Sequence, residues 1–380
     1  MRGTRVISTL ALLLLVCGCR IEPPLHLRQA VEVNVRLTTS VKAEFLWQTD
    51  WDSRWQFDWD EDTWGPLGYQ MPKSYRMHIY TQGPDHQPVS HRSYAFMGTS
   101  GEVSVFLGVH NLLFHNNDSE VLLFRSEDDL SDIYGYTRIV SSGLKATTPV
   151  KSLAQKQAAT KADVDEDMPE EAVAFEPDDL FALYKPDFEL TDDLSQYEYV
   201  DGTYIIRING DLVPESFIYL IQVRLQNNFG RVVGAVGGAA LTGVAQEVNL
   251  VTSERGSDAV TIPTDVRINR DKDPDLLGIR VHSFGIPGCN PYDEVSVAAA
   301  PEGKHFLVLS VTYFDYTYKN IRVDITDAFR ALPTGGVINL ELDVNDFPPE
   351  SGDGSVTGGG GFKPLMDDWK EERGGFDIVS

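Results

Sequence analysis

Residues 31–37 read VEVNVRL, and this short stretch indicates the fold class of the chain. Its apolar side chains fall on every second position, at Val31, Val33, Val35 and Leu37. Successive side chains of a strand point to opposite faces. A period of two therefore predicts a strand that is buried on one face and solvated on the other.

The same alternation recurs along the whole chain, at residues 75–79, 103–109, 219–225, 307–313, 321–325 and 338–344. Clusters of Gly, Pro, Asn and Asp separate these segments, as residues 83–85 and 116–118 illustrate. The sequence shows no amphipathic helix of ordinary length between them. It therefore predicts an all-β protein whose strands form antiparallel sandwiches.

Composition restricts the function classes. The 380 residues include 57 acidic and 32 basic side chains, for a formal net charge of −25. Nucleic acid is not expected as a partner, because phosphate binding needs a basic surface. Apolar residues make up 42% and charged residues 23%, which is ordinary for a globular protein. The length favours two domains.

The first residues are typical of a targeting segment. Arg2 and Arg5 precede an apolar stretch, Ile7–Val16, that is too short to span a bilayer. The Gly18-Cys19 step that follows resembles a bacterial lipobox. This resemblance implies cleavage before Cys19 and lipidation of its thiol, including a palmitate chain, at the outer membrane. An ordinary secretory signal with incidental cysteines is the alternative.

A change in composition divides the mature chain. Residues 147–199 are polar and then acidic, with DVDEDMPEE at residues 163–171. Low hydrophobicity with clustered like charge favours a solvated linker. The predicted division is a signal peptide at 1–18, a tether at 19–30, an N-terminal β-sandwich at 31–146, an acidic linker at 147–199, a C-terminal β-sandwich at 200–346, and a Gly-rich segment with the C-terminal tail at 347–380.

Residues 45–64 hold five of the six tryptophans. The aromatic side chains fall mainly on odd positions and the charged ones on even positions, which predicts one aromatic and one polar face. Such a face fits core or inter-domain packing, a platform for stacking sugars, or a surface for a protein partner. The candidate ligand or interface residues are Trp47, Trp51, Trp55 and Trp59.

The sequence contains no recognisable catalytic motif. It has no nucleophile elbow, phosphate loop or dinucleotide fingerprint, and Cys289 has no histidine partner nearby in the sequence. The Asp-rich turns at 58–62 and 271–275 have calcium-loop spacing, but they lack the Gly and Glu of an EF-hand. A solvated acidic turn is the simpler interpretation, with an irregular calcium site as the alternative. We therefore expect no catalytic residue, no cofactor and no metal, and a protein that is not an enzyme.

Three further stretches, in this order, resemble fimbrillin-like surface lipoproteins of type V pilus systems. They are GGAALTGVAQEVNL at 237–250, VDITDAF at 323–329 and GFKPLMDDW at 361–369. The resemblance extends to the lipobox and to the strand at 31–37. It implies two transthyretin-like Greek-key β-sandwich domains with short helical turns, on a lipid-anchored protein of the outer membrane and the cell surface.

The resemblance also implies a mode of assembly. Pilins of this group are joined by donor-strand exchange, in which a neighbour's extended segment fills the groove left by a missing strand. Val31, Val33, Val35 and Leu37 are the donor-strand candidate. Arg36 and Arg54 lack a clear processing context for the protease that cuts polymerising members, so an anchor or accessory subunit is expected. A surface glycan-binding lipoprotein that uses residues 45–64 is the alternative function.

Overall fold

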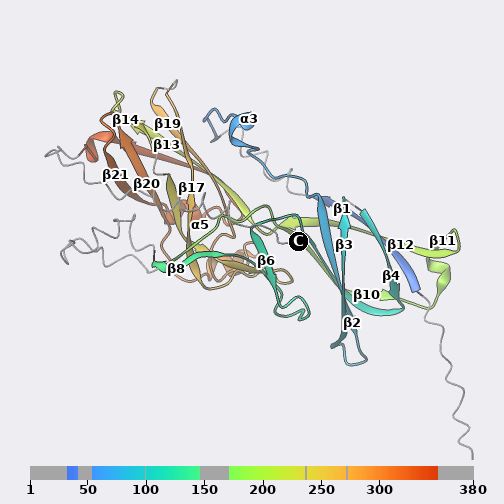
Figure 1. Cartoon of the computed structure of the whole chain (residues 1–380). Coiled ribbons are helices and arrows are strands. Elements are labelled where there is room, and N and C mark those ends of the chain that lie inside the picture. The colour runs from blue at the N-terminus through green and yellow to red at the C-terminus, as the bar shows by residue number, and fades with distance from the viewer. Residues whose placement is uncertain are drawn as a thin grey trace, which may run out of the picture.

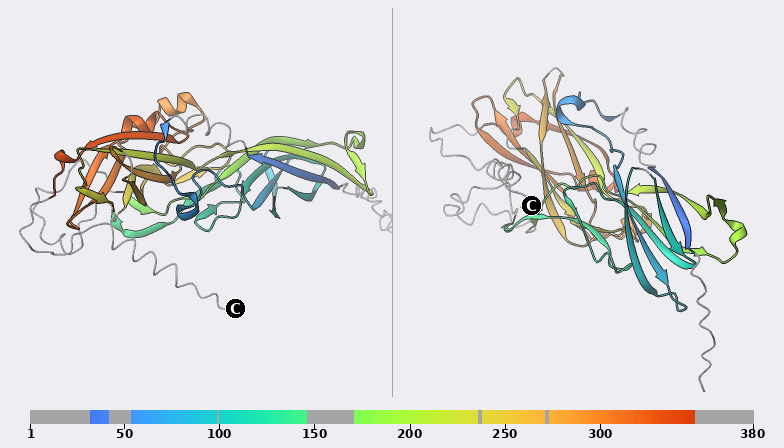
Figure 2. Two further views of the ribbon diagram at one scale, coloured as in Figure 1. Left: turned by 90° about the horizontal axis from the view of Figure 1, so that it is seen from above. Right: turned by 45° about the vertical axis from the view of Figure 1, so that its right-hand side comes forward.

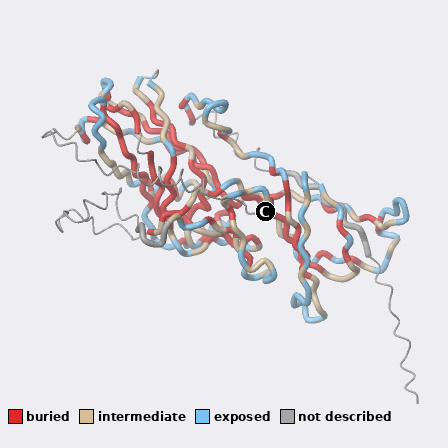
Figure 3. Tube along the Cα trace, in the orientation of Figure 1, coloured by how far each residue is buried: buried red, intermediate tan, exposed pale blue. Residues whose placement is uncertain are grey.

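The computed structural model describes residues 32–41, 54–98, 100–145, 171–235, 238–270 and 273–349. For residues 32–41 and 141–145 the backbone alone is described. The molecule is elongated, with one β-sandwich at each end and a joint between them (Figure 1). Buried residues concentrate inside both sandwiches and along the joint (Figure 3).

The first sandwich consists of one folded-over sheet with the order β3-β2-β5-β10-β12-β1-β4, and β11 pairs with β12. One layer contains β3 (Pro88–Met97), β2 (Ser74–Gln82), β5 (Gly108–Asn116) and β10 (Phe181–Leu190). The other contains β11 (Glu198–Val200), β12 (Thr203–Pro214), β1 (Glu32–Val41) and β4 (Ser100–Phe106). Only two residue pairs join β10 to β12, which lets the sheet fold over there.

Alternation decides which side chains fill this sandwich. On β2, Met77 and Ile79 point into the core, where they contact Leu112 and Phe114 of β5 and Val105 of β4. The neighbouring positions on β2 and β5 point out of the sandwich, toward the joint. The sheet is therefore covered on both faces, which explains why β2 and β5 are buried along most of their length.

The joint is a small apolar layer. Its three-stranded sheet consists of β16 (Glu247–Asn249), β7 (Tyr134–Thr137) and β6 (Leu122–Arg125). Tyr80 of β2 and Leu113 of β5 share one buried cluster with Leu122, Val248 and Phe284. Side chains from both sandwiches thus meet in one continuous hydrophobic contact.

The second sandwich has two sheets (Figure 2). The first sheet contains β18 (Val266–Asn269), β19 (Asp275–Ser283), β13 (Phe217–Gln226) and β22 (Gly336–Asp343). The second contains β14 (Val232–Gly234), β21 (Tyr318–Asp324), β20 (Phe306–Tyr313), β15 (Ala239–Ala245), β17 (Ala259–Thr264), β9 (Ala172–Ala174) and β8 (Ile139–Lys145). Tyr219, Ile221 and Val223 face Leu307 and Leu309 across the core.

The helices are single turns. They are α3 (Glu61–Trp64), α4 (Glu294–Ala298) and α5 (Thr326–Arg330), with 3₁₀ turns η2 (Leu194–Gln196) and η3 (Val344–Asp346). The predicted all-β sandwich architecture with short helical turns is confirmed. None of the helices in the described ranges is long and apolar enough to cross a membrane.

Strands of the two sandwiches alternate along the chain, in contrast to the division into domains that the sequence predicts. Within the predicted linker, residues 172–174 form β9 and residues 181–190 form β10. β10 and β12 complete the first sandwich, whereas β8 and β9 complete the second. The chain crosses the joint more than once, and the boundaries at residues 146 and 200 stay a prediction.

Candidate functional site

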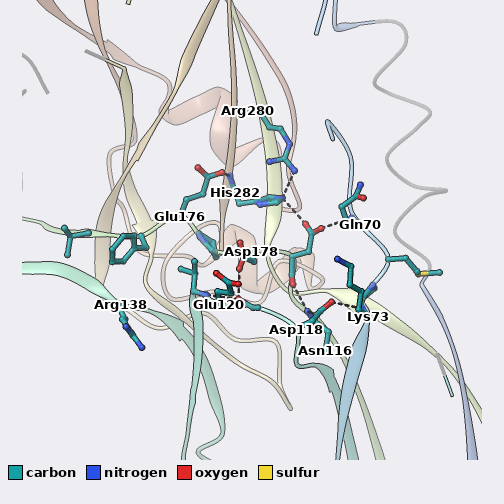
Figure 4. Close-up of a pocket in the computed structure, with 18 of the residues that line it drawn as sticks. Gln70, Lys73, Asn116, Asp118, Glu120, Arg138, Glu176, Asp178, Arg280 and His282 are labelled. Atoms are coloured by element: carbon teal, nitrogen blue, oxygen red, sulfur yellow. Dashed lines mark hydrogen bonds and ion pairs between the residues drawn. The ribbon is translucent and has the colours of Figure 1, made fainter. Parts of the chain in front are cut away.

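An open cavity lies beside the joint. It has a volume of about 1050 Å³ and is lined by residues 70–73, 116, 118–121, 138–140 and 175–179, with Arg280 and His282 of β19. These segments precede or follow strands of both sandwiches, so side chains far apart in the sequence converge there (Figure 4). No residue of this cavity was among the predicted site residues.

Asp179 contacts His282 on one wall of the cavity. The Asp179 Oδ1 atom lies 3.1 Å from His282 Nε2, and Asp179 Oδ2 accepts a hydrogen bond of 2.7 Å from the Gln70 backbone N–H. Burial by itself raises the pKa of Asp179. The hydrogen bond and charge of His282, together with the Gln70 N–H, outweigh burial and hold this pKa below its usual 3.8. Asp179 is therefore an ionised partner for His282.

Glu176 and Asp118 also bind backbone groups. Glu176 Oε1 accepts a hydrogen bond of 2.9 Å from the backbone N–H of His282, and burial raises the pKa of Glu176. Asp118 accepts one hydrogen bond from the Lys73 backbone N–H and another from the Asn116 side-chain amide, at 2.6 and 3.0 Å. These carboxylates satisfy backbone and amide donors where the strands leave their sheets.

The hydroxyl of Ser119, which lines the cavity, also has a structural role. Ser119 Oγ donates to Asp178 Oδ2 at 2.7 Å and accepts from the backbone N–H groups of Val121 and Leu122. A nucleophile needs a base that removes its proton. Asp178 instead accepts a hydrogen bond from Ser119 that closes the turn. The cavity is best described as a polar hinge region between two sandwiches.

The described ranges contain no group of three His, Cys, Asp or Glu side chains arranged as metal ligands. In the first Asp-rich turn, Asp60 caps α3 by accepting a hydrogen bond from the Thr63 backbone N–H. In the second turn, Asp271 lies outside the described residues, and Asp275 accepts a hydrogen bond of 2.7 Å from the Asn228 side-chain amide. Cys289 is buried, and its thiol donates to the carbonyl of Ile286.

The Trp-rich segment packs on the outer face of the second sandwich. Trp55 is 9% exposed and Phe57 is 4% exposed, and they contact Ile218, Leu220 and Leu276 of β13 and β19. Trp59 is half-buried, and its ring lies 6.3 Å from that of Phe57. Trp55 and Phe57 are buried whereas the alternate positions Gln56 and Asp58 are exposed, although the segment is not paired as a strand. Trp47 and Trp51 lie outside the described residues.

The donor-strand candidate corresponds to β1. Its backbone pairs on both sides, antiparallel to β4 over Glu32–Thr38 and parallel to β12 over Asn34–Val41. Val33, Val35 and Leu37 lie in this strand, whereas Val31 and the lipidation candidate Cys19 lie outside the described residues. β1 is therefore an interior strand of its own sandwich.

The chain is similar to known proteins in sequence over part of its length and in fold over most of it. The sequence profile described as "Domain of unknown function (DUF5119)" matches residues 52–265. No curated protein matches the chain. The solved structures that resemble it include an adhesin candidate from Bacteroides ovatus ATCC 8483, at 14% identity and a TM-score of 0.47, covering 86% of this chain and 96% of that one.

Two further structures have fimbrial descriptions. The fimbrial anchor protein Mfa2 from Porphyromonas gingivalis is 12% identical with a TM-score of 0.42, covering 82% of this chain and 90% of that one. The tip fimbrial protein Mfa3 from Porphyromonas gingivalis, with a C-terminal truncation, is 9% identical with a TM-score of 0.33, covering 77% of this chain and 81% of that one.

Proposed function

The chain belongs to the family defined by the domain of unknown function DUF5119, and we propose that it is a non-enzymatic structural subunit of a fimbria on the cell surface. In this proposal a lipid on Cys19 holds it in the outer membrane, and it serves as an anchor or accessory subunit. It joins its neighbour subunit by strand addition.

The observation that carries the proposal is the position of β1. This strand follows the predicted lipidation site and tether directly in sequence, and it lies between β12 and β4 with backbone pairs on both sides. A force on the lipid therefore acts on a strand that is held by two ladders. Breaking it free requires many backbone hydrogen bonds to separate together, which suits a mechanical anchor.

The same geometry explains how strand addition would work in a polymerising relative of this chain. If β1 were absent, β12 and β4 would each present an unpaired edge, and the resulting slot would accept an extended segment of a neighbour. Arg36 lies in the middle of β1, in register with Glu102 and Arg207. A protease needs an unpaired extended backbone, so β1 in place disfavours cleavage there and favours the anchor or accessory role.

The glycan alternative needs exposed aromatic faces in residues 45–64. Trp55 contacts the second sandwich and leaves too little surface for a sugar ring. We therefore do not propose sugar stacking on Trp55. Trp47 and Trp51 are not tested by the structure.

The lipid anchor is tested by metabolic labelling with an alkyne analogue of palmitate. The full chain and Cys17→Ala should be labelled and should sediment with the outer membrane, whereas Cys19→Ala should be unlabelled and released. Equal labelling of Cys19→Ala and the unchanged chain would exclude this anchor.

The structural role is tested by removing residues 32–41 from the full chain with the signal and tether left in place. We expect fimbriae of this variant to be shed into the medium, because its lipid no longer acts on a strand that two ladders hold. Unchanged fimbrial attachment in a strain lacking the protein altogether would refute the proposal.

A further inference from the structure

Three histidines from neighbouring strands of the first sandwich form a chain of hydrogen bonds. His78 Nδ1 of β2 lies 3.0 Å from His91 Nε2 of β3, and His78 Nε2 lies 3.0 Å from His115 Nε2 of β5. At the inner end, His115 Nδ1 lies 2.7 Å from the backbone oxygen of Asn116. His78 and His115 are fully buried, and His91 is partly exposed.

The three histidine rings lie in line, and this arrangement shows whether a metal ion or a proton lies between neighbouring rings. The ring centroids are 5.2 Å apart in both pairs, and the ring planes differ by only 12° and 18°. This centroid separation is about the N···N distance plus one ring radius on each side, so each nitrogen points straight at its partner nitrogen. A metal ion needs lone pairs that converge on a point beside the rings, whereas a head-on pair of nitrogens fits one shared proton.

The hydrogen bond between His115 Nδ1 and the Asn116 carbonyl fixes the position of every proton in the histidine chain. A carbonyl oxygen only accepts, so His115 Nδ1 carries a proton and donates to Asn116. The Nε2 atom of a neutral His115 then accepts from His78 Nε2–H, and His78 Nδ1 accepts in turn from His91 Nε2–H. This arrangement uses one proton per ring and leaves His91 Nδ1 as the one unprotonated nitrogen that accepts no hydrogen bond within the histidine chain.

The histidine chain can therefore hold at most one positive charge while its hydrogen bonds stay intact. A first extra proton fits on His91 Nδ1, at the outer end, without breaking a hydrogen bond. A second extra proton would place two N–H groups against each other at one of the two N···N contacts. That contact must then open, because two donors without an acceptor repel.

The histidine chain lies under the joint between the sandwiches. His78 and His115 are on the outer face of β2 and β5, and the ring of Phe124 from β6 covers His115 at a centroid distance of 4.2 Å. Tyr80 stacks on His91 at 4.7 Å, and its hydroxyl donates to the carbonyl of Glu127 at 2.6 Å. Opening a histidine contact thus disturbs the packing of the joint.

We propose that the histidine chain is an acid-sensitive latch that holds the β6–β7 layer, and with it the joint between the two sandwiches, closed at neutral pH. Uptake of a second proton opens the latch and loosens the joint. The proposal does not depend on the fimbrial role of the protein.

Charged groups around the latch set the pH at which it opens. On β2, Arg76 faces His78 and His115 and opposes their protonation. From the segment after β6, Glu127 and Asp128 favour protonation of His91. Glu127 is itself bound to Arg76 at 2.7 Å, and its nearer carboxylate oxygen is 3.9 Å from His78 Nε2.

Burial supports the same direction. Burial lowers the pKa of His78 to about 2 and that of His115 to about 4, from the ordinary value of 6.5, and it also lowers the pKa of His91. A histidine whose pKa is lowered in the folded state contributes nothing extra above the unfolded pKa. Below about pH 6.5 the unfolded chain binds the proton more readily than the folded protein, so the stability falls progressively as the pH drops toward the folded value. The latch is therefore closed at neutral pH and weakened in mild acid.

The test is hydrogen–deuterium exchange of the full chain at about pH 7.5 and about pH 5, corrected for intrinsic exchange. We expect exchange in Leu122–Arg125 and Tyr134–Thr137 to be at least about tenfold faster at the lower pH, and this increase to exceed the one in β13 and β19, to which His305 contributes. In His78→Gln this acid-dependent gain should be smaller, with the part due to His115 remaining. His305→Gln, which changes a buried histidine of the second sandwich, should keep the gain. Equal exchange of the two strands at both pH values in the unchanged protein, or an undiminished gain in His78→Gln, would refute the latch.

A second measurement needs no substitution. Nuclear magnetic resonance of ¹⁵N-labelled histidine side chains reports which ring nitrogen carries the proton. At neutral pH we expect His115 protonated on Nδ1, and His78 and His91 on Nε2. Another tautomer pattern, or uptake of two extra protons while β6 and β7 stay protected, would contradict the proposal even if the Gln variant does not fold.

Discussion

Phe57→Ala provides a direct test of how the Trp-rich segment is attached. Phe57 is 4% exposed and lies against Gly278 of β19, where an added Cβ would come within 2.6 Å of its ring. Replacing a buried Phe by Ala ordinarily costs about 3–5 kcal/mol, through lost burial and the cavity left behind. The segment lies on the surface of the sandwich and can partly relax into that space. We therefore expect the free energy of unfolding to fall by about 3 kcal/mol.

Urea unfolding provides the measurement, with circular dichroism for the strands and tryptophan fluorescence for the segment. Trp55, Trp59 and Trp64 all lie in or against the same aromatic cluster, so their emission should shift to longer wavelength in Phe57→Ala before the strands unfold. Phe229→Ala is the matched control, because Phe229 is 89% exposed and its loss should change stability by at most about 0.5 kcal/mol.

Gly278→Ala approaches the same contact from the other side. The added methyl group would push the Phe57 ring away from β19, so we expect destabilisation and the same emission shift. If Phe57→Ala costs less than about 1 kcal/mol and leaves the emission unchanged, the segment is not docked. Its tryptophan faces would then be available to a ligand, and the glycan interpretation would return.

Three further predictions concern buried charge and backbone conformation. Burial lowers the pKa of His305 to about 4, so His305→Gln should reduce by about 2 kcal/mol the stability lost between neutral pH and about pH 5 in urea titrations. Arg255 pairs with Glu215 at 2.9 Å and both are buried, so Arg255→Met should cost about 3–5 kcal/mol, and adding Glu215→Gln should restore part of it; no recovery in the double variant would contradict this reasoning. Gly243 has φ +75° and a Cβ there would collide with a backbone carbonyl, so Gly243→Ala should lower the melting temperature by several degrees, whereas Gly234→Ala, with open space around it, should not.

The histidine chain illustrates why the site was not visible in the sequence. In the sequence, His91 lies five residues from His86 and His115 lies five residues from His110, a spacing that favours no common helical face. The shared partner of His91 and His115 is His78, which is 13 residues from one and 37 from the other. The available signal was the alternation in β2, which places His78 and Tyr80 on the face opposite Met77. It could indicate the face, but it could not identify the neighbouring strands.

The cavity beside the joint could also not be predicted from the sequence. Asp179 lies in the predicted acidic linker, and its position among many carboxylates suggested a solvated residue. In the structure it is held by His282, more than a hundred positions away, and by the backbone of Gln70. A run of acidic residues has low hydrophobicity whether or not one of its members contacts a distant side chain, so composition does not distinguish the two cases.

The sequence by itself determined the features that depend on near neighbours in the chain. Alternation lies within a single strand, so the sidedness of β2, β13 and β20 was readable, as were the net charge and the aromatic and polar faces of the Trp-rich segment. The tertiary structure alone decided which strands pair and which way the aromatic face points. It placed β1 parallel to β12, formed β10 within the predicted linker, and brought three histidines into one line. The reason is that register and strand order depend on which apolar faces bury together across the whole molecule, and residues far apart in sequence make those contacts.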